Sequence, residues 1–164
     1  MAAPIYTGGK PFIKPGIRTR RVIIASASAT VTLAAGNTNS RYAFDRASGT
    51  SYTLPAPVAG LTFDFLVTVL QTSGANVVVT NAASVFLLGA VAMFSGEDVT
   101  PSSTLGPKMF AGNGTTHIKT TTNGTTTGGG IGSWMRYTAL SATQWFVEGV
   151  LKSPSGTLAT PFST

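Results

Sequence analysis

Hydrophobic residues alternate with polar ones at a period of two, and this alternation constrains the fold more than any other feature of the chain. It is clearest in residues 61–69, where Thr62, Asp64 and Thr68 separate apolar positions. Those apolar positions are Leu61, Phe63, Phe65, Val67 and Val69. Successive side chains of a β-strand point to opposite faces, so this spacing predicts a strand with one buried face.

Short β-rich segments recur along the chain between clusters of turn residues such as Ala35-Gly36-Asn37, Ala47-Ser48-Gly49 and Pro55-Ala56-Pro57. The predicted strands are 22–33, 41–46, 51–54, 61–71, 76–80, 84–94, 133–140 and 144–151. No ten-residue window shows the 3.6-residue period of an amphipathic helix. We therefore predict an all-β fold, a compact antiparallel sandwich or barrel that occupies residues 22–152 as a single domain.

Residues 95–132 interrupt this rhythm with Gly, Thr, Ser, Asn and Pro. Within them Asn113-Gly114-Thr115-Thr116 recurs as Asn123-Gly124-Thr125-Thr126. Asn-Gly favours a type I′ hairpin turn, and the β-branched, Thr-rich run 115–122 between the two repeats could form a projecting strand. The segment is therefore predicted to be a long Gly/Thr-rich loop or a projecting hairpin. A solvated loop and a loop that contacts a neighbouring molecule remain alternatives. Residues 153–164, with Pro154 and Pro161, are predicted to form an extended C-terminal tail.

The first 21 residues form a different kind of segment, rich in proline and glycine and without periodicity. They contain five of the eleven basic residues and none of the five acidic ones, so most of the net charge of +6 lies there. Several aliphatic and aromatic residues accompany these charges. An extended basic arm that becomes ordered along a partner is the expected structure.

The rest of the chain is poor in charge. Charged residues make up 10% of the whole sequence, against roughly 25% in an ordinary soluble domain. A hydrophobic fraction of 43% and a mean hydropathy of +0.26 exclude an intrinsically disordered polar chain. So few charges provide little solubility for a free monomer. We expect much of the surface to be covered by a partner or by copies of the chain.

Two targeting signals need consideration. The longest apolar run, residues 82–94, is too short for a membrane-spanning helix and is read as buried core. Arg18-Thr19-Arg20-Arg21 precedes Val22-Ile23-Ile24 and small residues up to Ala29, an order that resembles a secretory signal. Only three strongly apolar residues follow the arginines, which favours a basic arm leading into a strand.

The chain offers little for catalysis. The absence of cysteine excludes disulfides, thiolate chemistry and cysteine-ligated metals. The single histidine, His117, has no acidic residue near it in sequence, and adjacent Glu97 and Asp98 point to opposite sides of an extended chain. Asp64 and Glu148 fall at polar positions of predicted strands, where a solvated or salt-bridged carboxylate is expected. We predict no enzymatic activity and no catalytic, cofactor-binding or metal-binding residues.

One glycine-rich stretch superficially suggests phosphate binding. Gly128-Gly129-Gly130-Ile131-Gly132 lacks the Gly-Lys-Ser/Thr that opens a helix in a phosphate loop, and a β-rich segment follows it instead. A flexible hinge is the expected role.

The arm is the predicted contact surface. The residues expected to contact a partner are Lys10, Phe12, Ile13, Lys14, Arg18, Arg20 and Arg21. The cations could neutralise phosphates or dock on an acidic protein surface. The interleaved prolines and apolar residues favour a protein groove or an added strand at a sheet edge over nucleic acid.

Two stretches resemble β-rich virion proteins of tailed bacteriophages, such as capsid decoration (cement) proteins and head or tail fibres. The first comprises Ser51-Tyr52-Thr53-Leu54-Pro55-Ala56-Pro57, then Gly60 to Phe65, then Asn76-Val77-Val78-Val79. The second is Tyr137-Thr138-Ala139-Leu140-Ser141-Ala142-Thr143-Gln144-Trp145-Phe146-Val147-Glu148-Gly149. The resemblance covers roughly residues 50–151, but neither the arm nor the insertion at 96–132.

This resemblance implies a non-enzymatic structural protein without a cofactor. Such proteins are typically homotrimers or other homo-oligomers, bind the major capsid protein and lie on the outer surface of the capsid. Trp145 and Trp134 would be core or interface aromatics, with Trp145 in the core. The alternatives are a fibre or receptor-binding module, a coat protein whose basic arm faces nucleic acid, and a secreted carbohydrate-binding or adhesin module.

Overall fold

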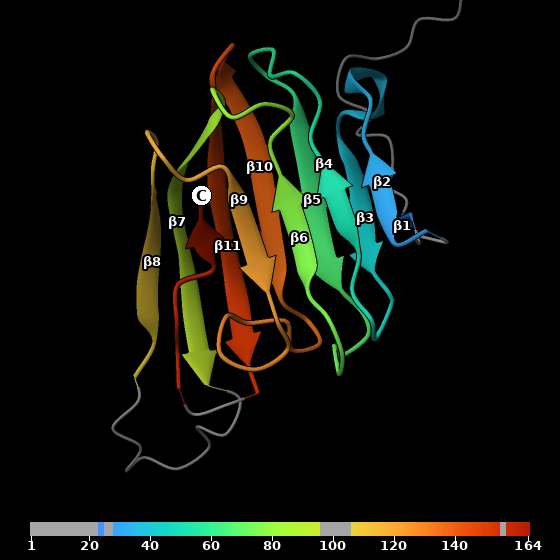
Figure 1. Cartoon of the computed structure of the whole chain (residues 1–164), viewed down its shortest axis with the longest axis vertical. Coiled ribbons are helices and arrows are strands. Elements are labelled where there is room, and N and C mark those ends of the chain that lie inside the picture. Colours follow the sequence, from blue (N-terminus) through green and yellow to red (C-terminus); the bar gives the residue numbers. More distant parts are fainter. Residues whose placement is uncertain (1–22, 25–27, 96–105, 155–156) are drawn as a thin grey trace, which may run out of the picture.

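A computed structural model describes residues 23–24, 28–95, 106–154 and 157–164, which form two β-sheets packed face to face (Figure 1). The predicted all-β fold is confirmed as a sandwich that does not close into a barrel. In the described residues the only helical element is a 3₁₀ turn at Ala35–Asn37. None of these residues belongs to a helix long and apolar enough to cross a membrane.

The two sheets have seven and five strands. In order across the larger sheet they are β1 (Ile23–Ile24), β3 (Ser40–Phe44), β5 (Thr62–Val67), β10 (Trp134–Ser141), β11 (Gln144–Ser153), β7 (Phe86–Ser95) and β8 (Lys108–Asn113). In order across the smaller sheet they are β12 (Phe162–Ser163), β9 (Lys119–Thr122), β6 (Asn76–Val79), β4 (Ser51–Thr53) and β2 (Thr30–Thr32).

The first six strands alternate between the two sheets. Each pair of consecutive strands, one from each sheet, forms one turn of the chain around the core, and three such turns lie side by side. As a result β1, β3 and β5 pair in parallel in one sheet, and β2, β4 and β6 pair in parallel in the other. The prediction of an antiparallel sandwich was therefore wrong in its strand directions, because the two sheets are mixed. The turn clusters near residues 36, 48 and 56 carry the chain across to the facing sheet, so consecutive strands do not pair.

The second half of the chain completes the larger sheet by a different route. Strands β10 and β11 form an antiparallel hairpin whose register closes at Ser141 and Gln144. This hairpin lies between β5 and β7, pairing antiparallel with β5 and parallel with the long strand β7.

Aromatic side chains dominate the core between the sheets. Trp145 is fully buried, as predicted, and its ring lies 5.9 Å from that of Phe63. The rings of Tyr52 and Tyr137 lie 5.1 and 5.4 Å from Phe65. The first two pairs are tilted and the third is edge-to-face. Aromatic pairs contribute beyond the area that they bury, by about 0.5–1.5 kcal/mol each.

The segment 95–132 is not a loop or a projecting hairpin in its described part, residues 106–132. It contributes β8 to the larger sheet and β9 to the smaller one. Thr120 and Thr122 of β9 are fully buried, and the Thr120 hydroxyl is hydrogen-bonded to the Tyr137 hydroxyl. Threonine is β-branched and fits a half-buried pleated strand, so a Thr-rich run forms a sheet strand here.

The predicted extended C-terminal tail is also part of the sandwich. Phe162 lies in β12, pairs with Thr120 of β9 and is 3% exposed, while Leu158 is 7% exposed. These two apolar side chains, set among polar residues, hold the segment on the core.

The two Asn-Gly-Thr-Thr repeats form the same local structure, at opposite ends of β9. In each, the asparagine Oδ1 accepts hydrogen bonds from the backbone N–H of the second, third and fourth residues that follow. Gly114 and Gly124 adopt φ of 71° and 70°, which glycine tolerates without strain. The repeats thus link the two sheets, and the type I′ hairpin reading of Asn-Gly was wrong because the side-chain carbonyl organises the turn.

Candidate interaction face

The outer face of the larger sheet is the side turned away from the five-stranded sheet. It carries a row of charged side chains and a row of apolar ones. Phe63, Phe65 and Val67 of β5 point into the core. Asp64 and Leu66 therefore point to the outer face, by the alternation of a strand. The same alternation and the pairing register place the outward residues of the neighbouring strands beside them.

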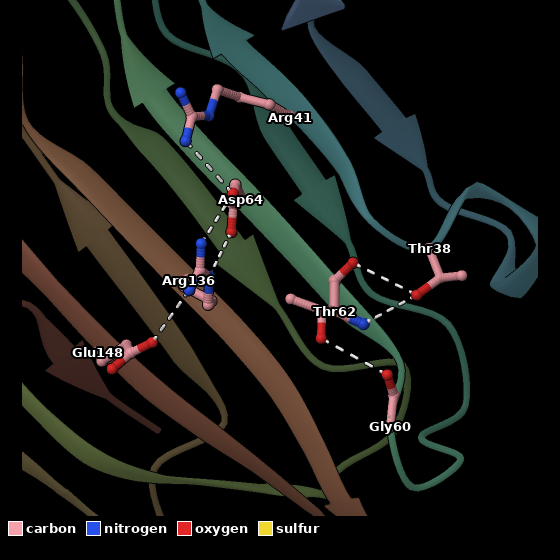
Figure 2. A network of polar contacts seen from close by, with 7 residues as sticks. All are labelled: Thr38, Arg41, Gly60, Thr62, Asp64, Arg136 and Glu148. Carbon is pink, nitrogen blue, oxygen red and sulfur yellow. Dashed lines mark hydrogen bonds and ion pairs between the residues drawn. The ribbon is translucent and has the colours of Figure 1, made fainter. Parts of the chain in front are cut away.

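A row of four charged residues crosses this face along one line of the register. Arg41 of β3, Asp64 of β5, Arg136 of β10 and Glu148 of β11 are successive pairing partners (Figure 2). We call them the charged row. Arg136 Nε lies 2.8 Å from Asp64 Oδ1, Arg41 Nη2 lies 3.4 Å from Asp64 Oδ2, and Arg136 Nη1 lies 3.6 Å from Glu148 Oε1. The signs alternate across the sheet and sum to zero.

Asp64 is the buried member of the charged row. Its side chain is 4% exposed, against 41% for Arg41, 36% for Arg136 and 46% for Glu148. A buried carboxylate is tolerated when cations and hydrogen bonds compensate its lost hydration, and the two guanidinium groups do so here. The salt-bridged alternative for Asp64 and Glu148 is confirmed.

Hydrogen bonds fix the start of β5 beside the charged row. The backbone N–H of Thr62 donates to Thr38 Oγ1 at 2.9 Å, and the Thr62 hydroxyl donates to the carbonyl of Gly60 at 3.5 Å (Figure 2). These contacts set the strand's position where the chain enters the sheet, two residues before Asp64.

A row of apolar side chains lies next to the charged row. On each strand of the charged row, the apolar member is two residues away from the charged one, on the same side of the row. We call it the apolar row, and its members are Ala43, Leu66, Trp134, Val150, Ala92 and Met109. Trp134 is 40% exposed and Met109 is 68% exposed. Phe94, also outward on β7, is 39% exposed. Large apolar side chains gathered on one sheet face mark a surface for association.

The outer face of the smaller sheet is different in chemistry. Its outward residues are Thr30, Thr32, Ser51, Thr53, Val77, Val79, Lys119 and Thr121. None of these is a large exposed hydrophobic residue. Within the described part of the chain, the outer face of the larger sheet is therefore the better candidate for contact with a partner.

The titratable group with the largest shift is a core tyrosine rather than a surface residue. Burial raises the pKa of Tyr137 well above its ordinary value of 10.0, and the hydrogen bond with Thr120 only partly offsets this. Burial also raises the pKa of Tyr42. Both shifts keep a phenol neutral inside the sandwich, which is a structural role.

The contacts of His117 are those of a residue that supports the fold. Its ring stacks on Phe162 with centroids 5.9 Å apart, and its Nδ1 accepts a hydrogen bond from the backbone N–H of Asn113 at 3.2 Å. Among the described residues, no three His, Asp or Glu side chains group together in a way that could hold a metal ion. Glu97 and Asp98 lie outside the residues that the structure describes.

The glycine-rich stretch is not a flexible hinge. Gly128, Gly129 and Gly130 are buried, and the Gly130 N–H donates to the carbonyl of Lys152 in β11 at 2.8 Å. A side chain at Gly129 would meet Gln71 and the backbone of Gly124. A Cβ would lie 2.8 Å from the backbone nitrogen of Gly124 at Gly129 and 2.9 Å from the carbonyl oxygen of Lys152 at Gly130, so neighbouring backbone leaves no room for a side chain at these two positions.

The seven contact residues predicted in the arm, from Lys10 to Arg21, lie outside the described residues. Sequence reasoning did not single out Arg41 and Arg136, although both stand at polar positions of predicted strands in register with Asp64. Pairing register is the missing information, because residues 41, 64, 136 and 148 become neighbours only once the strand order is known.

Comparison with known proteins found no matching protein-family model, no matching curated protein and no matching solved structure.

Proposed function

We propose that this protein is a non-enzymatic virion structural protein, a decoration (cement) protein that binds an assembled phage shell through its N-terminal arm and stabilises it. The observation that supports a role in assembly is the outer face of the larger sheet. There Trp134, Met109 and Phe94 remain exposed on a body with few charges. Exposed apolar faces of this kind suit contact between subunits.

The proposed partners are the major capsid protein and further copies of this chain, on the outer capsid surface. The arm supplies cations and apolar anchors for the shell, while the sandwich supplies a rigid body. Binding to the assembled lattice but not to free shell subunits would stabilise the shell by mass action. At a concentration 100 times the dissociation constant this amounts to about 2.7 kcal/mol per site.

The test is binding to shells that lack this protein, with the full chain and with a chain starting at residue 22. We expect the full chain to bind and the shortened chain to lose at least tenfold in affinity, because five cations and the anchors Phe12 and Ile13 are removed. Unchanged binding by the shortened chain would contradict arm docking. A full-length variant with Lys10 and Lys14 changed to Gln separates the charge contribution from the apolar one.

Titration with duplex and single-stranded nucleic acid at rising salt tests the coat-protein alternative. Steeply salt-dependent binding that the shortened chain loses would assign the arm to nucleic acid. Weak binding, with no difference between the two chains, would support the shell as the arm's partner.

A further inference from the structure

We infer that the outer face of the larger sheet binds the same face of a second copy of this chain, around a two-fold axis that runs parallel to the strands between β5 and β10. This inference concerns self-association alone and does not depend on the proposed virion function. It rests on the charged row, the apolar row and the width of the sheet.

That axis places each charge of the charged row opposite a charge of the other sign in the second copy. From β3 to β11 the row is positive, negative, positive, negative. A two-fold axis between β5 and β10 places β3 opposite the partner's β11 and β5 opposite the partner's β10. Arg41 then faces the second copy's Glu148, and Asp64 faces its Arg136. Each of these four charges then lies opposite a charge of the other sign, and each contact occurs twice, as in any isologous interface.

A second two-fold arrangement of the same faces is disfavoured by its charges. An axis perpendicular to the strands and through the charged row places each strand opposite itself, so that Arg41 meets Arg41 and Glu148 meets Glu148. Like charges across an interface are repulsive. Among axes parallel to the strands, only the one between β5 and β10 sets all four charges of the row opposite a charge of the other sign.

The same axis also pairs the four members of the apolar row that lie nearest to it. Leu66 of β5 comes to lie opposite Trp134 of the second copy's β10, and Ala43 opposite its Val150. The large Trp134 ring thus meets a smaller side chain near the axis, where the twist of the two sheets separates them least. A central, partly exposed tryptophan is the residue type that most often dominates an interface.

The sheet is wide enough for a stable contact. The axis superposes the six strands from β1 to β7 on their counterparts, a width of about 29 Å at the usual spacing of about 4.8 Å. A standard interface buries about 800 Å² on each partner, a patch of about 28 Å on a side.

Burial of the charged row is feasible because its charges are already paired within one chain. Asp64 contacts two guanidinium groups, and Arg136 bridges Asp64 and Glu148. The end members Arg41 and Glu148 are the most exposed. They therefore retain hydrogen-bonding capacity for the second copy.

The test uses charge reversal at the two ends of the row, followed by sedimentation equilibrium. We expect R41E and E148R each to weaken self-association at least tenfold, since like charges then face one another twice in the pair. An equimolar mixture of the two variants is expected to associate within about threefold of the unchanged protein. In the mixed pair the glutamate introduced in one chain faces the arginine introduced in the other, and the unchanged Glu148 of the first chain faces the unchanged Arg41 of the second.

The mixture separates an interface effect from damage to the single chain, because mixing cannot repair a misfolded subunit. Thermal unfolding of each variant checks the fold. W134T, at an exposed strand position, is expected to weaken association at least tenfold as well, whereas K119E on the outer face of the smaller sheet is expected to leave it unchanged.

Three results would overturn the inference. The first is an unchanged protein that remains monomeric or forms trimers. The second is a mixture that associates no better than its components. The third is association that withstands R41E, E148R and W134T but is lost when residues 1–21 are removed, which would assign the contact to the arm.

Discussion

Asp64 is the carboxylate that contacts both arginines of the charged row. Its carboxylate contacts Arg41 and Arg136, and it is the only member of the charged row that is almost fully buried. The carboxylate lies on the outer side of β5, while its neighbours along the strand, Phe63 and Phe65, are buried in the core.

Replacing Asp64 with Asn keeps the shape of the side chain and removes its charge. We expect the free energy of unfolding to fall by about 1–2 kcal/mol, because two guanidinium groups lose their carboxylate while remaining more than a third exposed. E148Q is the matched control, with an expected loss below about 0.5 kcal/mol. Urea unfolding measures both, and equal effects would contradict the role given to Asp64.

Tyr137 makes the stability of the protein fall as the pH becomes alkaline. Since burial raises the pKa of its phenol above 10.0, the unfolded chain releases the proton at lower pH than the folded chain does. The tyrosine's contribution to stability is therefore complete below pH 10 and is lost as the pH rises above it, by up to about 1.4 kcal/mol per pH unit.

The Y137F variant isolates this effect. It should be less stable than the unchanged protein at neutral pH, having lost the hydrogen bond with Thr120, and its stability should fall less steeply as the pH rises above about 10. Urea unfolding at a series of pH values measures the two slopes. Identical slopes would show that Tyr137 does not titrate differently in the folded and unfolded chains.

At the scale of elements, the two Asn-Gly-Thr-Thr loops are the most distinctive joints of the sandwich. They flank β9, and each replaces missing backbone pairing with three hydrogen bonds to one asparagine side chain. Because both loops carry the chain between sheets, they determine where β9 sits.

Replacing Asn123 with Ala removes the acceptor for three backbone N–H groups. We expect a loss of about 1–2 kcal/mol in the free energy of unfolding, comparable with the loss of a helix cap. Asn123→Asp keeps an acceptor at this position and should recover more than half of that loss. The same pair of changes at Asn113, the more exposed repeat, should follow the same order with smaller values, as measured by thermal unfolding.

Strands with apolar alternation could be predicted from the sequence, and segments without it could not. The predicted strand 61–71 appears as β5, and 144–151 as β11, because their buried residues are large and hydrophobic. Strand β9 falls within residues 115–122, where a projecting strand was an expectation, but its burial was not predicted. Its inward residues are Thr120 and Thr122, and polar side chains indicate no core position until Tyr137 provides a hydrogen-bond partner. The order of the strands in each sheet could not be predicted from the sequence either. The charged row could therefore not be predicted, because its four residues become neighbours only through that order.

At the scale of the whole molecule, a body with few charges is expected to bury part of its surface. The structure narrows that expectation to one face, where paired charges and exposed apolar side chains occur together. The arm, which lies outside the described residues, then has a separate proposed role toward the shell. Two distinct contacts, sheet to sheet and arm to shell, would let one small domain link its neighbours.

The molecular mass of the purified, full-length protein over a range of concentrations tests most directly whether this sheet face is an interface. Sedimentation equilibrium should give a mass that rises from 16.8 kDa toward twice that value as concentration increases. The same measurement on W134T should stay near 16.8 kDa. A mass of 16.8 kDa for the unchanged protein throughout, or one approaching three times that value, would contradict the account.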